Sequence, residues 1–477
     1  AEEGSVFEAN YGVQFILIED IDFGKTKKDG SLKADYNIGD SDSSGNPTTF
    51  ILASKGLCIS GQRTTESFRL SDFVPFKEIS LANPDVTGIE TVYDSIGNIY
   101  YEVNDLSEDV VYASIPNFAN DNENVESILQ IKPAPYRYTA RTNLGDRTTT
   151  LTLGGGSADS FEDDAIPDPS TFALPLYGKT TFNRLALNPD KLLETKTLGV
   201  YAPNVDLFVT YRYGGGLEHN IEKGTLRSVR QLQLKFPYNT NPNVASRIRT
   251  SVEVDNTERG RGGDERPSIT DLKNYVQVVK NAQERIVTKP DVLARIYSMP
   301  SNFGRVYRAG LRSNPNNPLA TQLFVTSRDA NGRLTTTTDS LKKNLKTYLN
   351  SFRMISDSID IFDSPITNLG LLYEITVDPM LNKKTVLQAV SAKLRKFFDQ
   401  KNFQIDQPIL LSDVHNVIYK TIGVLSVNKI KFTNITGMVE GREYSNVYHD
   451  IGLSTTKGNA ILPPVGGIFE VKYIDSD

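Results

Sequence analysis

Alternating apolar and polar residues in the first part of the chain predict β-strands. Val13, Phe15 and Leu17 alternate with other residues, and Phe50 and Leu52 repeat the pattern. Two strand-like runs, 90–93 and 99–103, flank the turn sequence Asp94-Ser95-Ile96-Gly97-Asn98, which predicts a hairpin. We therefore expect residues 1–153 to form a β-rich domain.

A second β-rich domain is expected at residues 173–257, after a linker or long surface loop at residues 154–172. The linker segment contains three glycines, two prolines and a cluster of acidic residues, with no apolar periodicity. In the second domain, one strand face is predicted for Val205, Leu207, Val209, Tyr211 and Tyr213. Alternation over Leu232–Phe236 predicts a further strand with one wet face.

After Pro237 the apolar period changes from two residues to the helical 3.6. Ser268 with Asp271, and Thr288 with Asp291, resemble capping boxes, in which an N-cap side chain and an acid three residues later bond to each other's backbone. They predict helices at 268–283 and 288–298. We expect residues 258–303 to form a small helical insertion.

Residues 304–434 are expected to form an α/β domain with the element order βαβααβ. Strands are predicted at 322–326, 370–377 and 424–432, and a helix capped by Ser412 is predicted to end at Gly423. Two further helices are predicted from apolar stripes: Leu341, Leu345, Tyr348, Leu349 and Phe352; and Val386, Leu387, Val390, Leu394, Phe397 and Phe398. Both stripes should pack on one sheet that contains 370–377 and 424–432. With a β-rich tail at 435–477, the fold class is α+β and multidomain.

Composition narrows the class of protein. The 477 residues carry 52 Lys and Arg against 58 Asp and Glu, and a net charge of -6 predicts no nucleic-acid partner. Apolar runs fall far below the roughly 20 residues of a membrane-spanning helix, so no membrane insertion is expected. The first residues have no signal-peptide pattern, and Ala1 predicts a removed initiator Met or a trimmed start.

Residue types that carry chemistry are scarce. Cys58 is the single cysteine, and three histidines, His219, His415 and His449, are spread along the chain without a nucleophile or metal motif. We therefore expect no enzyme, no cofactor and no metal site. The segment Asp40–Ile51 begins like a calcium loop but has Ile51 at its twelfth position, which cannot donate a carboxylate.

Two charged segments, residues 159–168 and 259–263, could each bind a ligand or serve only as a connection in the fold. The acidic residues 159–168 could hold a hard cation, although a solvated loop is favoured. Arg259-Gly260-Arg261-Gly262-Gly263 is similar to Arg-Gly segments that bind nucleic acid, although a flexible connection is favoured because acidic residues flank it.

Three aromatic residues crowd the end of one predicted helix. Phe397, Phe398 and Phe403 present more aromatic surface than one helix face directs into its own core. We predict that they anchor a self-association interface in the C-terminal half, residues 240–477. The alternative, that all three fill the α/β core, stays open.

Several strings in chain order resemble the baseplate J-like family of contractile-tailed bacteriophages, which includes the baseplate wedge subunit of T-even-type phages. The clearest are Arg259–Ile269 (RGRGGDERPSI), Glu284–Asp291 and Tyr297–Pro300. The weaker ones are Tyr211–Gly216, Asn314–Phe324, Leu345–Asp357, Gln407–Ile409, Gly423–Val427 and Ile468–Tyr473. Together they cover about residues 195–477.

The resemblance implies a noncatalytic virion protein of the tail baseplate, assembled in the host cytoplasm. Its implied partners are itself, as a homodimer within a six-fold ring, and other wedge, sheath-initiator and hub proteins. The implied ring changes shape when the tail sheath contracts during genome ejection. Two alternatives are a subunit of a non-viral contractile injection system and a carbohydrate-binding or carbohydrate-degrading tail protein.

Overall fold

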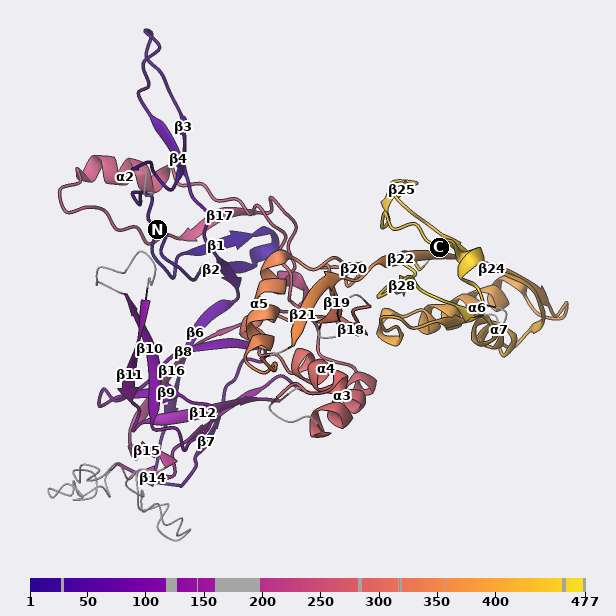
Figure 1. Ribbon diagram of the computed structural model, residues 1–477, viewed down its shortest axis with the longest axis horizontal. Helices are drawn as coiled ribbons and strands as arrows, with labels where there is room; N and C mark the ends of the chain where they lie inside the picture. Colours follow the sequence, from indigo (N-terminus) through magenta and orange to yellow (C-terminus); the bar gives the residue numbers. More distant parts are fainter. Residues whose placement is uncertain are drawn as a thin grey trace. The chain divides into compact units, whose positions relative to one another are not determined.

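The computed structural model describes residues 1–26, 30–116, 127–143, 145–158, 198–281, 285–315, 317, 320–355, 357–456 and 460–474 (Figure 1). Contacts divide the chain into two compact units. The composite unit joins Ala1–Gly61 to Gly215–Asp477, and the continuous unit is Gln62–Gly214. Several separate sheets and a smaller number of helices confirm the predicted α+β multidomain class.

The continuous unit is built on a seven-stranded sheet. Neighbouring strands are antiparallel except β9 and β12, which run parallel. In spatial order the strands are β6 (Gln62–Arg69), β16 (Asp206–Tyr213), β8 (Val86–Asp94), β9 (Ile99–Glu102), β12 (Arg137–Thr142), β13 (Thr149–Leu153) and β7 (Glu78–Ser80). The core below this sheet includes Leu151, Leu153, Leu207, Val209 and Tyr211, all fully buried.

Strand pairing in this sheet crosses the predicted linker. β16 pairs with β6 and β8, which both precede residue 154, so the two predicted β-rich domains share one sheet. Within the predicted linker itself, β14 (Gly156–Ser157) pairs in parallel with β15 (Val200–Tyr201). Alternation of apolar residues predicts a strand but does not indicate which strand it pairs with. The predicted domain boundary at residues 154–172 therefore falls between strands that belong to one seven-stranded sheet. Residues 159–197, which hold the acidic cluster, lie outside the described residues.

The predicted hairpin at residues 90–103 is confirmed. β8 and β9 pair antiparallel, and the Asp94 carboxylate accepts hydrogen bonds from the backbone N–H groups of Ile96, Gly97 and Asn98 at 2.9–3.0 Å. Gly97 has a φ of +103°, which a residue with a side chain adopts only under strain. The turn sequence therefore specifies the hairpin locally.

The N-terminal part of the composite unit is a four-stranded antiparallel sheet. Its order is β17 (Leu226–Gln231), β1 (Val6–Ala9), β2 (Gln14–Leu17) and β5 (Cys58–Ser60), and its core includes Phe7, Val13, Phe15, Leu17 and Leu226. Since β1 pairs with β17, residues from the two predicted β-rich domains again share one sheet.

The strand predicted at Leu232–Phe236 is wrong. The ladder ends at Gln231, and the Gln233 N–H donates to the Ser5 hydroxyl at 3.1 Å instead of to a neighbouring strand. Leu232 is only partly buried against the adjacent core, so the alternation there reflects packing on an irregular segment.

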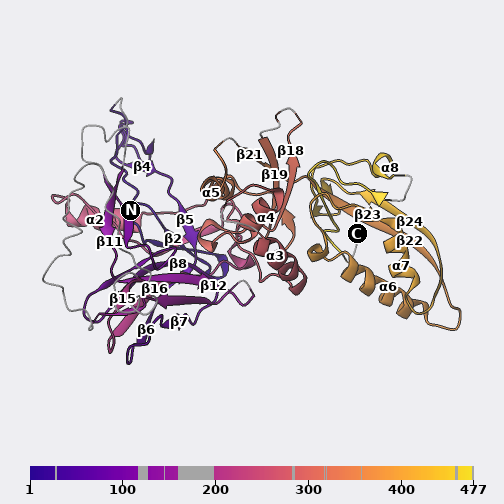
Figure 2. The ribbon, with the colours of Figure 1, turned by 60° about the horizontal axis from the view of Figure 1, so that its bottom comes forward.

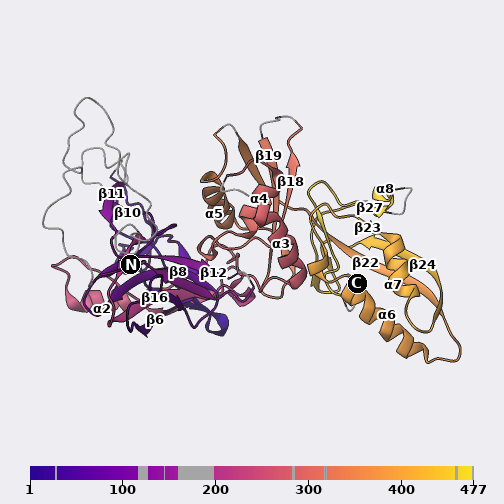
Figure 3. The ribbon, with the colours of Figure 1, turned by 90° about the horizontal axis from the view of Figure 1, so that it is seen from below.

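The predicted helical insertion is confirmed in the described residues. α3 (Ile269–Asn281) and α4 (Lys289–Tyr297) lie side by side (Figure 3). The capping box of α4 is complete: Thr288 N donates to the Asp291 carboxylate at 2.8 Å, and Asp291 N donates to the Thr288 hydroxyl. At the start of α3, Asp271 N donates to the Ser268 hydroxyl at 3.2 Å, and that hydroxyl donates to the Asp271 carboxylate at 2.8 Å. An earlier helix, α2 (Pro242–Thr250), is capped by Asn241 and buries no residue.

A mixed sheet follows the insertion. β19 (Ala320–Arg328) pairs antiparallel with β18 (Arg308–Ser313) and β20 (Leu334–Thr335), and parallel with β21 (Ser358–Asp363). The crossover between β19 and β21 contains α5 (Asp339–Asn350), whose Leu341, Leu345 and Leu349 pack with residues of β18 and β19 (Figure 2). Burial of each leucine contributes about 1.5–3 kcal/mol.

The second α/β sheet has the order β24 (Val424–Asn434), β22 (Ile366–Val377) and β28 (Ile468–Glu470). α6 (Lys383–Phe397) and α7 (Leu411–Tyr419) pack against each other and cover it (Figures 2 and 3). The prediction that both apolar stripes share one sheet is therefore wrong. The stripe on α5 covers the β18–β21 sheet because α5 connects two of its strands, and the stripe on α6 packs with β22 and β24.

Two details of this region differ from the sequence prediction. α7 begins at Leu411 and ends at Tyr419, so Ser412 lies in its first turn instead of capping it, and Gly423 lies four residues beyond its end. In its described residues, the C-terminal tail contributes β28 to the second α/β sheet and otherwise contains short elements: β25 (Met438–Val439), β26 (Arg442–Glu443), α8 (Ile451–Ser454) and β27 (Ala460–Ile461), which pairs with β23 (Ile409–Leu410). Within the described residues, no helix combines the length and apolar character needed to cross a membrane.

Candidate functional site

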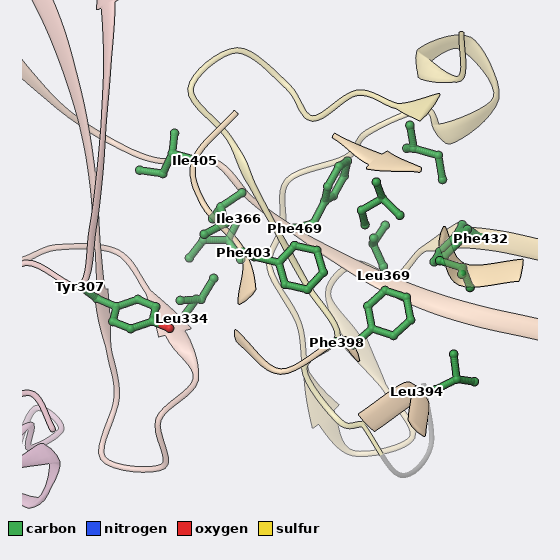
Figure 4. Packing of buried hydrophobic residues seen from close by; sticks show 14 of the residues in the cluster. Tyr307, Leu334, Ile366, Leu369, Leu394, Phe398, Phe403, Ile405, Phe432 and Phe469 are labelled. Atoms are coloured by element: carbon green, nitrogen blue, oxygen red, sulfur yellow. The ribbon is translucent and has the colours of Figure 1, made fainter. Parts of the chain in front are cut away.

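The three predicted interface residues lie in and against the core of the composite unit. Phe398 and Phe403 are buried, with their rings stacked 6.0 Å apart between centroids, and Phe397 packs edge-on against Phe398 (Figure 4). Phe432 from β24 also contacts Phe398. The core thus encloses Phe398 and Phe403, as in the alternative interpretation, whereas Phe397 packs against the same core and stays partly exposed.

The three histidines have local, unrelated partners. His219 lies 3.6 Å from Glu218, the His415 ring stacks on Tyr419, and His449 Nε2 lies 2.8 Å from the Leu462 carbonyl oxygen. Burial, with a smaller contribution from Glu19, raises the pKa of the Cys58 thiol to about 11, so it is protonated at neutral pH. No group of three or more potential metal ligands occurs in the described ranges.

The calcium-like loop satisfies its own carboxylates. Asp42 accepts hydrogen bonds from the N–H groups of Asn46 at 2.8 Å and Ser44 at 2.9 Å, and Asp40 accepts from the Thr49 hydroxyl at 3.0 Å. The bonds from Asn46 hold the pKa of Asp42 below its usual value. The loop is thus an ordered turn that carries negative charge.

The Arg-Gly segment forms an internal strap, defined here as residues 259–268. Arg259 and Arg261 both pair with Glu222, at 2.8 and 2.5 Å. The backbone of Gly263 donates to and accepts from the Asn220 side-chain amide, at 2.9 Å each. A Cβ on Gly263 would lie 2.2 Å from the Gly216 carbonyl oxygen, so this close approach requires glycine. The segment is therefore a connection, as favoured, but a hydrogen-bonded and ion-paired one instead of a flexible one, because it packs closely on residues 216–222.

The strap leads into a buried arginine and tyrosine cluster. Arg308 and Arg328 lie on either strand of the β18–β19 pair, with their guanidinium groups 4.4 and 4.3 Å from the Tyr307 ring centroid. Arg328 forms an ion pair with Asp264 of the strap. Burial raises the pKa of Tyr307 to about 12, although both arginines oppose the shift.

Arg308 connects three segments of the composite unit. Its Nε and Nη2 atoms donate to the carbonyl oxygens of Phe403 and Lys401 at 3.0 Å each, and Nη2 lies 3.3 Å from the Asp271 carboxylate at the start of α3. Burial alone would lower the pKa of Arg308, but Tyr307 and Asp271 outweigh it and raise the pKa. The cluster therefore positions elements of the composite unit, while the Tyr307 hydroxyl and the Arg328 Nε lie buried without a hydrogen-bond partner among the described residues.

Exposed apolar side chains are the most unusual feature of the surface. β3 (Asp35–Ile38) and β4 (Phe50–Ala53) pair antiparallel as a separate two-stranded sheet, here called the arm. Tyr36 opposes Leu52 and Ile38 opposes Phe50, so all four side chains share one face. Tyr36 is 63% and Phe50 60% exposed. A hairpin of two strands is marginal in water unless its apolar face is covered.

Two further apolar surfaces occur elsewhere. On the hairpin of β10 (Val110–Pro116) and β11 (Ser127–Pro133), the exposed Tyr112, Leu129 and Ile131 lie on one face. At the end of the β22–β24 pair, here called the tip, the loops 378–382 and 420–423 and the start of β24 expose Met380, Leu381, Ile422 and Leu425. The Asp378 N–H donates to the Gly423 carbonyl oxygen at 2.9 Å, which joins the two loops. The sequence patterns predicted β4, β22 and β24 but not β3, β10 or β11, and they gave no sign that these faces stay exposed.

Comparison with known proteins finds no sequence match and a weak structural similarity. No family model and no curated protein matches the chain. Among solved structures, the chain is similar to one in a cryo-EM structure of the six-fold symmetrised baseplate of the anti-feeding prophage, with 13% identity and a TM-score of 0.28. The match covers 78% of this chain and 72% of that chain. Values this low do not establish a common fold or function.

Proposed function

We propose that the protein is a noncatalytic structural subunit of a bacteriophage contractile-tail baseplate, which assembles through protein–protein contacts. The observation that carries an assembly role is the apolar surface left exposed on separate elements, namely the arm, the tip and the β10–β11 hairpin. Contiguous exposed apolar surface on a folded chain marks sites where other proteins bind.

The interior supports the same role. The buried Arg308 and Arg328 bond to Asp271, Asp264 and backbone carbonyl groups of the chain itself, and so connect its segments. In a subunit that transmits force between neighbours, these internal bonds hold separate sheets in fixed positions, while the exposed apolar faces bind the neighbouring proteins. We propose that the subunit rearranges as part of a ring when the sheath contracts.

The baseplate assignment rests on the sequence resemblance. Its clearest strings fall on the strap, on the capped start of α4 and on the end of α4, where they have defined structural roles. The proposed partners are a second copy of the chain within a six-fold ring, together with wedge, sheath-initiator and hub proteins. The proposed location is the virion tail, after assembly in the host cytoplasm.

Electron microscopy of particles purified from cells that make this protein tests the proposal. An antibody or a small tag on the chain should label the end of a contractile tail in a ring. Label on tail fibres, together with carbohydrate cleavage by the purified chain, would favour the carbohydrate-degrading alternative. Label on contractile particles that contain no genome would assign the same role to a non-viral injection system.

A further inference from the structure

We propose that the arm of one copy docks on the tip of a second copy, in a head-to-tail contact. This inference rests on the proposed function only in treating the chain as an assembly subunit. The arm offers an apolar face of Tyr36, Ile38, Phe50 and Leu52. The tip offers Met380 and Ile422, which are 91% and 87% exposed, with Leu381 and Leu425 beside them.

The regions around the arm and the tip have opposite net charge, which favours contact between these two surfaces. Residues 1–61, which include the arm, contain five Lys and ten Asp or Glu, a net charge of -5. Residues 378–425, which include the tip, α6 and α7, contain seven Lys or Arg and four Asp, a net charge of +3. The arm ends in the acidic turn that carries Asp40 and Asp42. Opposite charges around two apolar faces favour contact between them over contact of either face with itself.

The first turn of α6 supplies an independent observation. Lys383 and Lys384 begin this helix, and its first turn contains no acidic residue. The N-terminus of a helix has partial positive charge, so lysines there are unfavourable. The chain thus keeps two cations beside the tip at a local cost, as expected where an acidic partner binds.

The shape next to the tip also fits a projecting hairpin. An open hollow of about 440 Å³ is lined by Lys384, Leu387, Gln388, Ser391 and Arg395 of α6. Leu387 is itself exposed, so the hollow extends the apolar and basic character of the tip along the helix.

The size of the arm predicts the strength of the contact. Four large apolar side chains, about half exposed, present on the order of 400 Å² per copy. A stable interface takes roughly 800 Å² from each partner. The isolated contact should therefore be reversible and depend on protein concentration.

Two full-length double variants test the contact by complementation. Ile38→Thr with Phe50→Thr keeps β-branched residues in the arm, and Met380→Ser with Ile422→Ser alters only exposed side chains of the tip. Sedimentation velocity should show the unchanged protein growing beyond a dimer as its concentration rises, whereas each double variant stays monomeric. An equimolar mixture of the two variants should form a dimer and stop there, because it contains one intact arm and one intact tip.

The matched control is Ile355→Ser, at a fully exposed position outside both surfaces, which should associate like the unchanged protein. Lys383→Glu with Lys384→Glu should weaken association at least about tenfold and reduce its dependence on salt, while the thermal melt is unchanged or raised. A mixture that stays monomeric, or an arm or tip double variant that still associates alone, would overturn the head-to-tail contact. Ring labelling of tails by this chain would then leave the baseplate proposal standing.

Discussion

The β16 strand and the arm show the same sequence pattern with opposite outcomes. In β16, Leu207, Val209 and Tyr211 alternate with other residues and are completely buried, because partner strands flank β16 and a core lies below it. In the arm, Phe50 and Leu52 alternate in the same way but stay exposed, because β4 pairs only with β3 within the described residues. Alternation therefore specifies a strand with an apolar face, while what covers that face is decided elsewhere in the chain or by another molecule.

The largest loss of stability is expected at the buried cluster. Arg308→Leu should lower the free energy of unfolding by about 3–5 kcal/mol, because it leaves the Asp271 carboxylate and two carbonyl oxygens without their cation. Arg312→Leu is the control, since its pair with Asp406 is 42% exposed on the arginine side and should cost about 1 kcal/mol or less. Urea denaturation measures the free energy of unfolding of both variants. Equal decreases for Arg308→Leu and Arg312→Leu would contradict the distinction between buried and exposed ion pairs.

The strand comparison itself predicts the next largest difference. Leu207→Ala should destabilise the continuous unit by about 2–5 kcal/mol, because it opens a cavity in a closed core. The same change at Leu52 of the arm should stay within about 0.5 kcal/mol, because that side chain is already hydrated. Chemical denaturation, with hydrogen exchange to assign each transition to its unit, measures both. A loss at Leu52 as large as that at Leu207 would mean that the arm is covered within its own chain.

Much of the local structure was predictable from these patterns. The helix caps at Ser268 and Thr288 and the Asp94 turn were identified correctly because their hydrogen bonds join residues within a few positions of one another. The pairing of β1 with β17 joins residues more than 200 positions apart, and no local signal specifies it. The burial of Phe398 depends in part on its contact with Phe432 of β24, and no local pattern around the helix indicates that contact.

A smaller effect is expected from a buried acid. Glu470 accepts hydrogen bonds from Leu334 N and Asn368 Nδ2 at 2.8 Å each, and burial raises its pKa from 4.5 to about 7 against the opposing effect of these donors and Lys472. Because the folded state binds this proton more tightly than the unfolded state, stability should fall as pH rises from 4.5 through 7.

The matched variant is Glu470→Gln, which does not titrate. Between pH 4.5 and 8, the unchanged protein should lose up to about 3 kcal/mol relative to this variant. Melting curves across that range, taken for both proteins, give the difference directly. A difference that does not vary with pH would show that Glu470 stays ionised throughout.

The central claim is that the uncovered faces are assembly surfaces of a baseplate subunit. Cryo-electron microscopy of tailed particles that contain this chain measures it most directly, at a resolution that traces the arm and the tip. The expected result is a ring of copies around the tail hub, with Phe50 and Met380 buried against neighbouring chains. Particles in which the chain is absent from the baseplate, or lies in it with both faces exposed to solvent, would contradict the claim.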